Sequence, residues 1–304
     1  PTLQQEKPRF LDLPLHRRRG GLAASAMPGR PKKANRSLRF LAPAALAALM
    51  LVAFTWPSAA SASRQSAVGL NAKGTKVRAT VETTSDYGDP NYGYPGEIEI
   101  MIQRDGGYYV DQFIDRPPGC GDCERVYAQG VRVTDMGGSR EPEIIFSFYS
   151  GGAHCCTSWR IFYWQNGRYH ATTHIWGNPQ GPRRFYWAPR GLLMPASDDR
   201  FAYAFDSFAE SEYPVQVWRF KHNRMVDVTR KHPNFVRKDL KIQARKWHRR
   251  ARRGSAAGPL AAWVADMCSL NKCRQSFRVA GGAVRRGAVS KSIYGNSLRP
   301  FMRK

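Results

Sequence analysis

Six cysteines carry the most distinctive spacing in this sequence. Four of them form two doublets, one as Cys-Gly-Asp-Cys after Pro-Pro-Gly and one as an adjacent pair in Ser-Gly-Gly-Ala-His-Cys-Cys-Thr. An even number of cysteines is typical of a disulfide framework in an exported chain. Because adjacent cysteines rarely bond to each other, we predict two cross-links between the doublets and a local bridge between the last two cysteines. The six disulfide candidates are Cys120, Cys123, Cys155, Cys156, Cys268 and Cys273.

Two other chemistries compete for the same thiols. Four thiolates, or three of them with His154, make a ligand set for a four-coordinate zinc site. Adjacent ligands are awkward for a tetrahedron, however, and export argues against such a site. Cys120 and Cys123 also have the spacing of a redox pair, but redox pairs begin a helix after a strand, and here prolines precede them. Disulfides are therefore the favoured interpretation.

His154 is the leading candidate for a catalytic base. Gly151 and Gly152 stand just before it and allow close backbone approach by a ligand. Asp135 and Asp198 are the candidate acidic partners, which would make the protein an extracellular hydrolase. No nucleophile elbow, zincin helix or phosphate-binding loop accompanies these residues. We therefore expect a structural histidine and a protein that is not an enzyme, with the hydrolase as the alternative.

A segment rich in acidic and small residues precedes an apolar strand sequence. It reads Val133-Thr-Asp-Met-Gly-Gly-Ser-Arg-Glu-Pro-Glu-Ile-Ile-Phe-Ser-Phe-Tyr-Ser-Gly-Gly-Ala-His-Cys-Cys. It resembles the loop-and-strand segment of exported bacterial proteins related to the FG-GAP/VCBS repeat group. Residues 198–205 and 220–229 resemble the later part of such proteins, so the resemblance covers about 131–233. It implies a β-rich fold and export, and it assigns no activity.

In that group the loop has the form Asp-x-Asp-x-Asp-Gly-x-Pro-Glu/Asp and often holds calcium. Here Asp135 occupies the first position, but Gly137 and Ser139 occupy the third and fifth, and Arg140 replaces the turn glycine. Oxygen ligands remain only at Asp135, Ser139 and Glu143, whereas calcium takes about six to eight. We therefore predict a degenerate loop without calcium and no other cofactor, with Arg140 placing its cation where the ion would sit.

The N-terminal region has the organisation of an export signal. Residues 27–62 contain a basic start, an apolar run from Phe40 to Phe54 and a small-residue end at Ala60-Ser-Ala, so we predict cleavage before Ser63. The alternative is an N-terminal membrane anchor, but about 15 apolar residues are short of the roughly 20 needed to span a bilayer. Residues 1–26 are interpreted as an upstream extension. The predicted location is secreted or in the cell envelope.

Residues 77–230 have a β pattern, and residues 63–76 are interpreted as a linker. Alternating apolar and polar runs surround two-residue turns, and three such pairs recur with Ile100, Ile161 and Val217 at equivalent positions. We predict a disulfide-braced, antiparallel β domain of propeller-blade-like repeats, too few to close a propeller. The predicted turns are 104–107, 165–168 and 221–224.

Residues 231–304 differ in both pattern and charge. Apolar residues recur at helical steps after Pro233, and two further helices are expected around 259–268 and 272–286. This region has 19 Lys and Arg against two acids, Asp239 and Asp266, whereas residues 63–230 have 19 of each charge. Such a basic region suits polyanions. The predicted polyanion-binding residues are Lys238, Lys241, Arg245, Lys246, Arg249, Arg250, Arg252 and Arg253.

These patterns together predict an exported binding or structural protein. Export favours an anionic envelope polymer or a membrane surface as partner of the basic region and makes nucleic acid the less favoured one. The β domain is expected to bind a protein or a glycan. Its aromatic residues are interpreted mainly as core, with a carbohydrate-binding platform as the alternative. These residues are Phe162, Trp164, Tyr186, Trp187, Trp218 and Phe220.

Overall fold

The structure is a computed structural model of the 304-residue chain. It describes residues 63–83, 97–120, 123, 126–151, 156–178, 181–252, 256–290, 298 and 301. The expected upstream extension and signal peptide, at 1–62, lie outside the described residues. All the elements described below belong to one compact unit, Pro57–Lys304.

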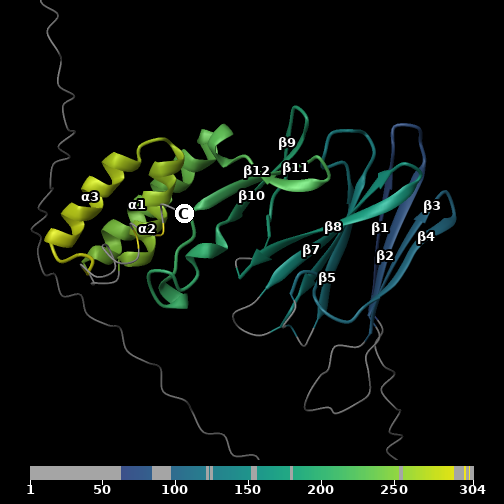
Figure 1. The fold of residues 1–304 in the computed structure, drawn as a ribbon, viewed down its shortest axis with the longest axis horizontal. Coiled ribbons are helices and arrows are strands. Elements are labelled where there is room, and N and C mark those ends of the chain that lie inside the picture. The colour runs from purple at the N-terminus through teal and green to yellow at the C-terminus, as the bar shows by residue number, and fades with distance from the viewer. Residues whose placement is uncertain are drawn as a thin grey trace, which may run out of the picture. The chain divides into compact units, whose positions relative to one another are not determined.

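Three antiparallel sheets of four strands follow one another along the chain, and none of them closes on itself (Figure 1). The first contains β1 (Ser63–Leu70), β2 (Lys76–Thr83), β3 (Ile98–Arg104) and β4 (Gly107–Ile114) in that order. The second contains β5 (Tyr127–Thr134), β6 (Glu143–Tyr149), β7 (Thr157–Gln165) and β8 (Arg168–Gly177). The third has the order β12-β11-β10-β9 and contains β9 (Tyr186–Ala188), β10 (Gly191–Ser197), β11 (Val215–Lys221) and β12 (Arg224–Asp227).

The predicted hairpins are confirmed in all three sheets. They connect β3 to β4, β7 to β8 and β11 to β12. Both residues of each two-residue turn have positive φ, as the twist of a tight hairpin requires. The third turn places His222 at φ 52° and Asn223 at φ 61° without a glycine. Ile100, Ile161 and Val217 lie in β3, β7 and β11, each the third strand of its sheet in chain order.

The expected linker at 63–76 is wrong for its first half. Ser63–Leu70 forms β1, which pairs with β2 from Ser63 opposite Thr83 to Leu70 opposite Lys76. The strand lies at the edge of its sheet, and most of its side chains are exposed. It therefore buries no apolar face and leaves no alternating signal in the sequence. It is attached by backbone pairing with β2, by a 3.1 Å contact between the Ser66 and Thr80 hydroxyls and by a 3.0 Å ion pair between Arg64 and Glu82.

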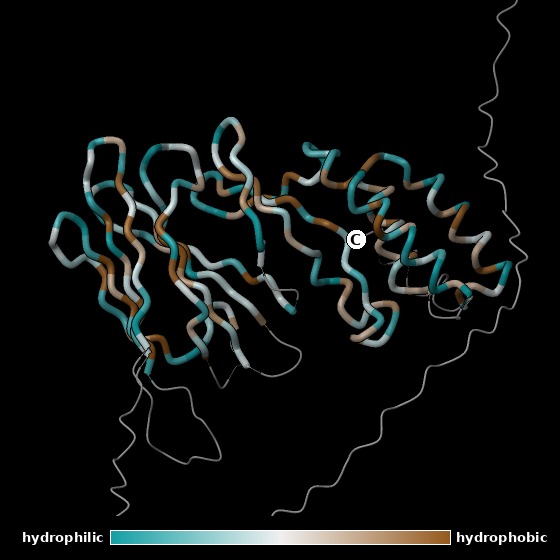
Figure 2. The backbone as a smooth tube through the Cα atoms, turned by 180° about the vertical axis from the view of Figure 1, so that it is seen from behind, coloured by the Kyte–Doolittle hydropathy of each residue, from teal (hydrophilic) through white to brown (hydrophobic). Residues whose placement is uncertain are grey.

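The second sheet is the middle layer of the core. Ile144, Phe146 and Phe148 of β6 pack with residues of β2 and β3, whereas Ile145 packs with residues of β10 and β11. Both faces of β6 are thus covered, which explains its continuous apolar sequence. Hydrophobic stretches along the inner strands are visible in Figure 2.

Three helices follow the sheets, as predicted: α1 (Pro233–Ala251), α2 (Ala257–Ser269) and α3 (Cys273–Arg285). Short 3-10 helices lie before them: η1 (Asp199–Phe201), η2 (Phe208–Glu210) and η3 (Thr229–Lys231). Phe201, Trp247 and Leu260 belong to a separate hydrophobic cluster that joins α1 and α2 to the segment after β10. Among the described helices, none is long and apolar enough to cross a membrane.

The disulfides correct part of the predicted pairing. Cys268 and Cys273 form the expected local bridge, which joins the end of α2 to the start of α3. Cys120, however, is bonded to Cys123, with 5.5 Å between their Cα atoms, and not to the second doublet. Two cysteines three positions apart in a loop can reach this Cα–Cα distance. Cys120 and Cys123 can therefore bond to each other without a partner in another loop. Cys156 is also disulfide-bonded, and Cys155 lies outside the described residues.

Candidate functional site

The turn between β5 and β6 contains the three predicted calcium-ligand candidates. Asp135 accepts hydrogen bonds from the backbone N–H groups of Ser139 and Arg140, at 3.0 and 2.9 Å. The Ser139 hydroxyl donates to the Glu141 carbonyl oxygen at 3.2 Å. Arg140 adopts φ 66°, the left-handed conformation that a turn glycine adopts readily. The turn thus keeps a left-handed residue where the motif has glycine, and backbone N–H groups donate hydrogen bonds to Asp135.

Glu143 lies buried beneath the same turn. Its Oε2 atom accepts hydrogen bonds from Met136 N at 2.7 Å and Gly137 N at 3.2 Å. Burial raises the pKa of the Glu143 carboxyl to about 7, and the nearby Asp135 charge adds to the rise, although the backbone donors oppose it. Near neutral pH the Glu143 carboxyl is therefore only partly ionised.

These residues do not fit a calcium ion. The carboxylates of Asp135 and Glu143 already accept backbone hydrogen bonds, and Ser139 is bonded within the turn. Within the part of the chain that the structure describes, no three His, Cys, Asp or Glu side chains come together as a metal site. The turn is therefore assigned a structural role, fixing the loop between β5 and β6.

Of the candidate catalytic residues, the structure describes Asp135 and Asp198. His154 lies outside the described residues. Asp198 is buried and caps η1, and its Oδ2 atom pairs with Arg200 Nη2 at 2.5 Å. No hydrogen bond among the described residues joins Asp198 to Asp135. Both aspartates thus make structural contacts, and the hydrolase alternative stays a prediction that depends on His154.

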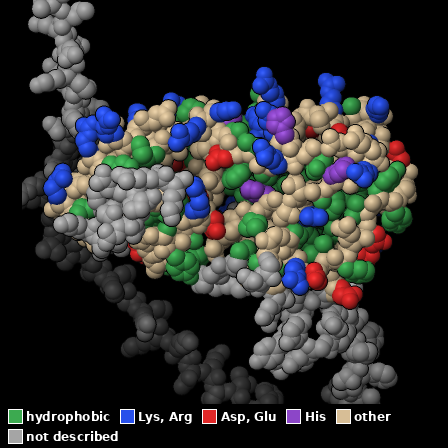
Figure 3. Space-filling model, viewed as in Figure 1, with side chains coloured by type: hydrophobic (Ala, Val, Ile, Leu, Met, Phe, Trp, Pro, Cys, Tyr) green, Lys and Arg blue, Asp and Glu red, His purple; other side chains and the backbone are tan. Residues whose placement is uncertain are grey.

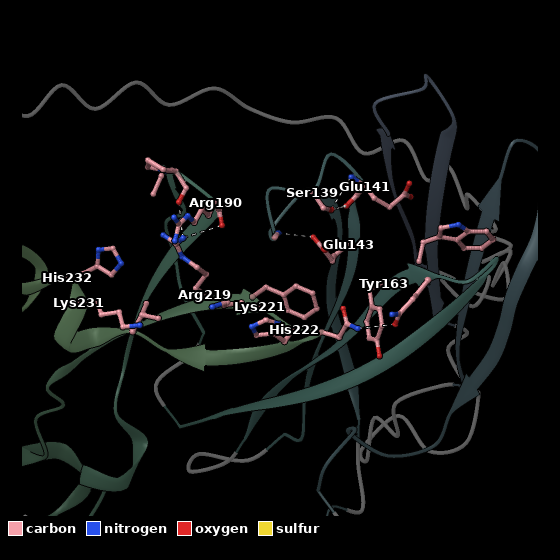
Figure 4. A pocket seen from close by; sticks show the side chains of 18 residues that line it. Ser139, Glu141, Glu143, Tyr163, Arg190, Arg219, Lys221, His222, Lys231 and His232 are labelled. Atoms are coloured by element: carbon pink, nitrogen blue, oxygen red, sulfur yellow. Dashed lines mark hydrogen bonds between the residues drawn. The ribbon is translucent and has the colours of Figure 1, made fainter.

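A cleft of about 900 Å³ opens between the second and third sheets (Figure 4). The β5–β6 turn and the end of β7 form one wall. The β9–β10 turn, the β11–β12 hairpin and the η3 segment leading into α1 form the other. Tyr163 gives the cleft aromatic surface, and Gln165 and Asn223 give it amide groups joined by a 3.1 Å hydrogen bond.

The charges in the cleft are unbalanced. Glu141 is held by Arg104 through contacts of 2.6 and 3.2 Å, so its charge is already neutralised. Glu143 is partly protonated near neutral pH, as described above. None of the cleft's four Lys and Arg side chains forms an ion pair with a carboxylate within the described residues. These four are Arg190, Arg219, Lys221 and Lys231.

Two details show how strongly positive this wall is. Burial lowers the pKa of the His232 imidazole, and the charges of Arg219 and Lys231 lower it further. Arg219 donates through Nη1 to the carbonyl oxygens of Pro189 and Arg190, at 2.8 and 3.2 Å. Its Nε–H is buried and has no hydrogen-bond acceptor among the described residues. The wall thus presents donors and positive charge without a matching acceptor.

The second basic surface lies on α1. Five of the predicted polyanion-binding residues are exposed along one face of this helix, a set called the α1 stripe below. Two others are not free, because Lys246 and Arg250 pair with Glu212, and Arg250 also pairs with Glu210. Arg253 lies outside the described residues. The α1 stripe consists of Lys238, Lys241, Arg245, Arg249 and Arg252.

The only two acids of the basic region lie inside it. Asp239 of α1 accepts a hydrogen bond from Val215 N at 3.0 Å, and Asp266 of α2 is 1% exposed. Burial raises the pKa of Asp266 to about 9, and the neighbouring Asp239 charge and hydrogen bond contribute. The pair therefore shares a proton near neutral pH. In Figure 3, most visible Asp and Glu side chains lie over the sheets, whereas Lys and Arg extend over the helices.

Sequence analysis predicted the α1 stripe but missed the cleft. The stripe is contiguous in sequence and follows helical steps, so its residues can be recognised together. The cleft draws Arg190 from the β9–β10 turn, Arg219 and Lys221 from β11 and Lys231 from η3. No sequence pattern marks these four residues as one set. The aromatic residues interpreted as core are only partly buried. Phe162 and Phe220 lie in the core, whereas Trp187 is 72% exposed.

Comparison with known proteins gives a limited relationship. The chain is similar to a probable thylakoid lumen protein of Synechocystis sp., with 30% identity over 113 residues. The similar region covers 33% of this chain and only 30% of that protein. No family model matches the chain, and no solved structure matches it. The relation to the FG-GAP/VCBS repeat group therefore stays a prediction.

Proposed function

We propose that the protein is an exported, non-catalytic binding protein whose C-terminal helices hold an acidic polymer outside the cytoplasm. The α1 stripe carries the proposal, because its five exposed cations have no acidic neighbour on their helix face. The only acid of α1, Asp239, contacts Val215 and Gln243 instead. Export is supported by the signal-like N-terminal sequence, by the disulfides and by the similarity to a lumen protein.

The arrangement of the stripe is costly for the free protein. Its members follow one another at intervals of three or four residues, over about 21 Å of helix. Like charges at these intervals destabilise a helix by about 0.2–0.5 kcal/mol per pair. Four such pairs occur along the stripe without a compensating carboxylate. A bound polyanion would relieve this repulsion, which gives the arrangement a use in binding.

The helices favour a polymer over a lipid bilayer as the partner. A helix that lies in a membrane surface inserts an exposed apolar face. The large exposed hydrophobic residues of the described chain all lie outside α1, α2 and α3. Many apolar residues of these helices are instead collected in the cluster that includes Trp247 and Leu260. Contact through the stripe is therefore electrostatic.

Binding of long-chain polyphosphate, a polyanion without sugar or lipid, tests the proposal. We expect binding that weakens steeply as salt is raised, because exposed charge contacts are screened. Lys241→Glu should reduce the affinity by about tenfold or more, since it removes one cation and adds a repulsive charge. The same change should stabilise the fold by about 0.5–1 kcal/mol by replacing repulsion with favourable pairs. Isothermal titration calorimetry and urea unfolding measure the two effects.

The matched control is Lys73→Glu, which makes the same change of charge in the turn between β1 and β2. It should leave polyphosphate affinity within about twofold of the wild type, because its charge lies outside the stripe. Equal losses for Lys73→Glu and Lys241→Glu would show that net charge, not the stripe, governs binding. Tighter binding to phosphatidylglycerol vesicles than to polyphosphate would contradict a polymer partner.

A further inference from the structure

The cleft between the second and third sheets is separate from the α1 stripe. We propose that it binds an anionic saccharide of one or two sugar units. The inference goes beyond the polymer-binding function, because none of the stripe residues lines the cleft. It rests on the unmatched charge, the aromatic and amide surface and the size of the cleft.

The charge of the ligand follows from the groups that lack partners. Arg219, Lys221 and Lys231 bring cations to one wall, and no carboxylate of the described residues pairs with them. The buried Nε–H of Arg219 lacks an acceptor, and buried donors in native proteins nearly always have one. The same guanidinium is fixed in place by its bonds to Pro189 and Arg190. A carboxylate or phosphate group that meets these cations balances their charge.

The body of the ligand follows from the rest of the lining. Tyr163 lines the cleft at the end of β7 and contacts the buried Phe220, with 6.2 Å between their ring centroids. Gln165 accepts a hydrogen bond from Asn223, which leaves the Gln165 amide N–H groups and the Asn223 carbonyl oxygen for other partners. Aromatic faces with amides beside them suit the apolar faces and hydroxyl groups of a sugar ring.

The size of the cleft is also appropriate. A volume of about 900 Å³ lies within the range of small-molecule sites, roughly 300–1,000 Å³. Such a space admits a disaccharide but not a folded polymer. The walls come from two sheets that are joined where Leu192 N donates to Met136 O at 2.9 Å. The cleft is thus built by the packing of two sheets and is formed before a ligand arrives.

Isothermal titration calorimetry with digalacturonate and with glucose 6-phosphate tests the proposal and distinguishes a carboxylate from a phosphate group. At least one of them should bind, and glucose, which lacks a charge, should not. Arg219→Gln should weaken binding by about tenfold or more, because it removes a charged hydrogen-bond donor. Lys221→Gln should weaken it by a smaller factor. Since Lys221 is exposed, this second variant tests the site without disturbing the packing.

A nuclear magnetic resonance titration of His232 gives an independent readout. Burial lowers the pKa of this imidazole and the charges of Arg219 and Lys231 lower it further, so a bound anion that offsets these charges should raise it. Lys241→Gln on the α1 stripe should leave saccharide binding unchanged while weakening polyphosphate binding, so that either proposal can fail alone. No binding of either saccharide in the millimolar range would overturn the proposal. Unchanged affinity in both Arg219→Gln and Lys221→Gln would also overturn it.

Discussion

Asp266→Asn is expected to make the protein more stable at pH 8 and to flatten the dependence of its stability on pH. Burial and the neighbouring Asp239 raise the pKa of Asp266 to about 9 in the folded protein. An unfolded aspartic acid has a pKa of about 3.9. Between about pH 4 and pH 9, the folded chain therefore binds a proton that the unfolded chain has lost.

The sign of the effect follows from this proton. The stability contributed by protonated Asp266 is complete below the unfolded pKa and is lost as pH rises toward the folded pKa. One proton corresponds to a slope of about 1.4 kcal/mol per pH unit between roughly pH 4 and pH 9. An asparagine does not titrate, and its amide N–H can donate to Asp239 in place of the acid proton. The slope belonging to this residue should therefore vanish in the variant.

Urea unfolding of the wild type and the variant across this pH range measures the difference directly. Asp115→Asn provides a matched control, because the Asp115 side chain is 83% exposed and faces solvent. That control should give a pH profile parallel to the wild type. If the Asp266→Asn profile is also parallel, the two carboxyl groups do not share a proton, and the assignment of the buried pair is wrong.

Gly191→Ala is expected to separate the second and third sheets at the cleft. Gly191 has φ 104°, and a Cβ atom there would lie 2.2 Å from the Met136 carbonyl oxygen. The adjacent Leu192 N–H donates to that same oxygen at 2.9 Å. On the other side of the contact, a Cβ on Gly138 would lie 2.7 Å from Gly191 N. Two glycines thus allow the backbones of the two turns to touch.

The expected cost is on the order of 3 kcal/mol or more, since the alanine is strained and also collides with backbone that cannot move aside easily. Gly74→Ala is the matched control, because Gly74 has φ 80° and its Cβ would meet nothing within 4 Å. That change should cost about 1–2 kcal/mol from the backbone conformation alone. Urea unfolding of both variants gives the comparison, and equal costs would show that the close approach contributes nothing.

Much of the local structure was predictable from the sequence. The three hairpins follow from alternating runs around short turns, in which Asp105 and Asn166 precede glycines that readily adopt positive φ. The helix beginning at Pro233 follows from apolar residues at helical steps. These signals depend on neighbours a few residues apart, so they act in the same way whatever the rest of the chain does. The α1 stripe was predictable for the same reason.

Other features depend on partners that are distant in sequence. Strand β1 has no buried face, so only its backbone pairing with β2 reveals it. The disulfide between Cys120 and Cys123 depends on the path of a loop that composition does not determine. The buried pair of Asp239 and Asp266 depends on the packing of α1 against α2, although the sequence already marked these residues as the only acids of the basic region.

By itself, the sequence determined the hairpins, the three helices, the uneven distribution of charge and the exposed basic face of α1. The tertiary structure alone decided which groups of distant segments meet. It stacked the second sheet between the other two, placed Arg219 and Lys231 on one wall of a cleft and buried the two acids together. The physical reason is that hydrogen-bonded turns and helical periodicity are local, whereas burial, pKa shifts and clefts arise only when packed surfaces exclude water.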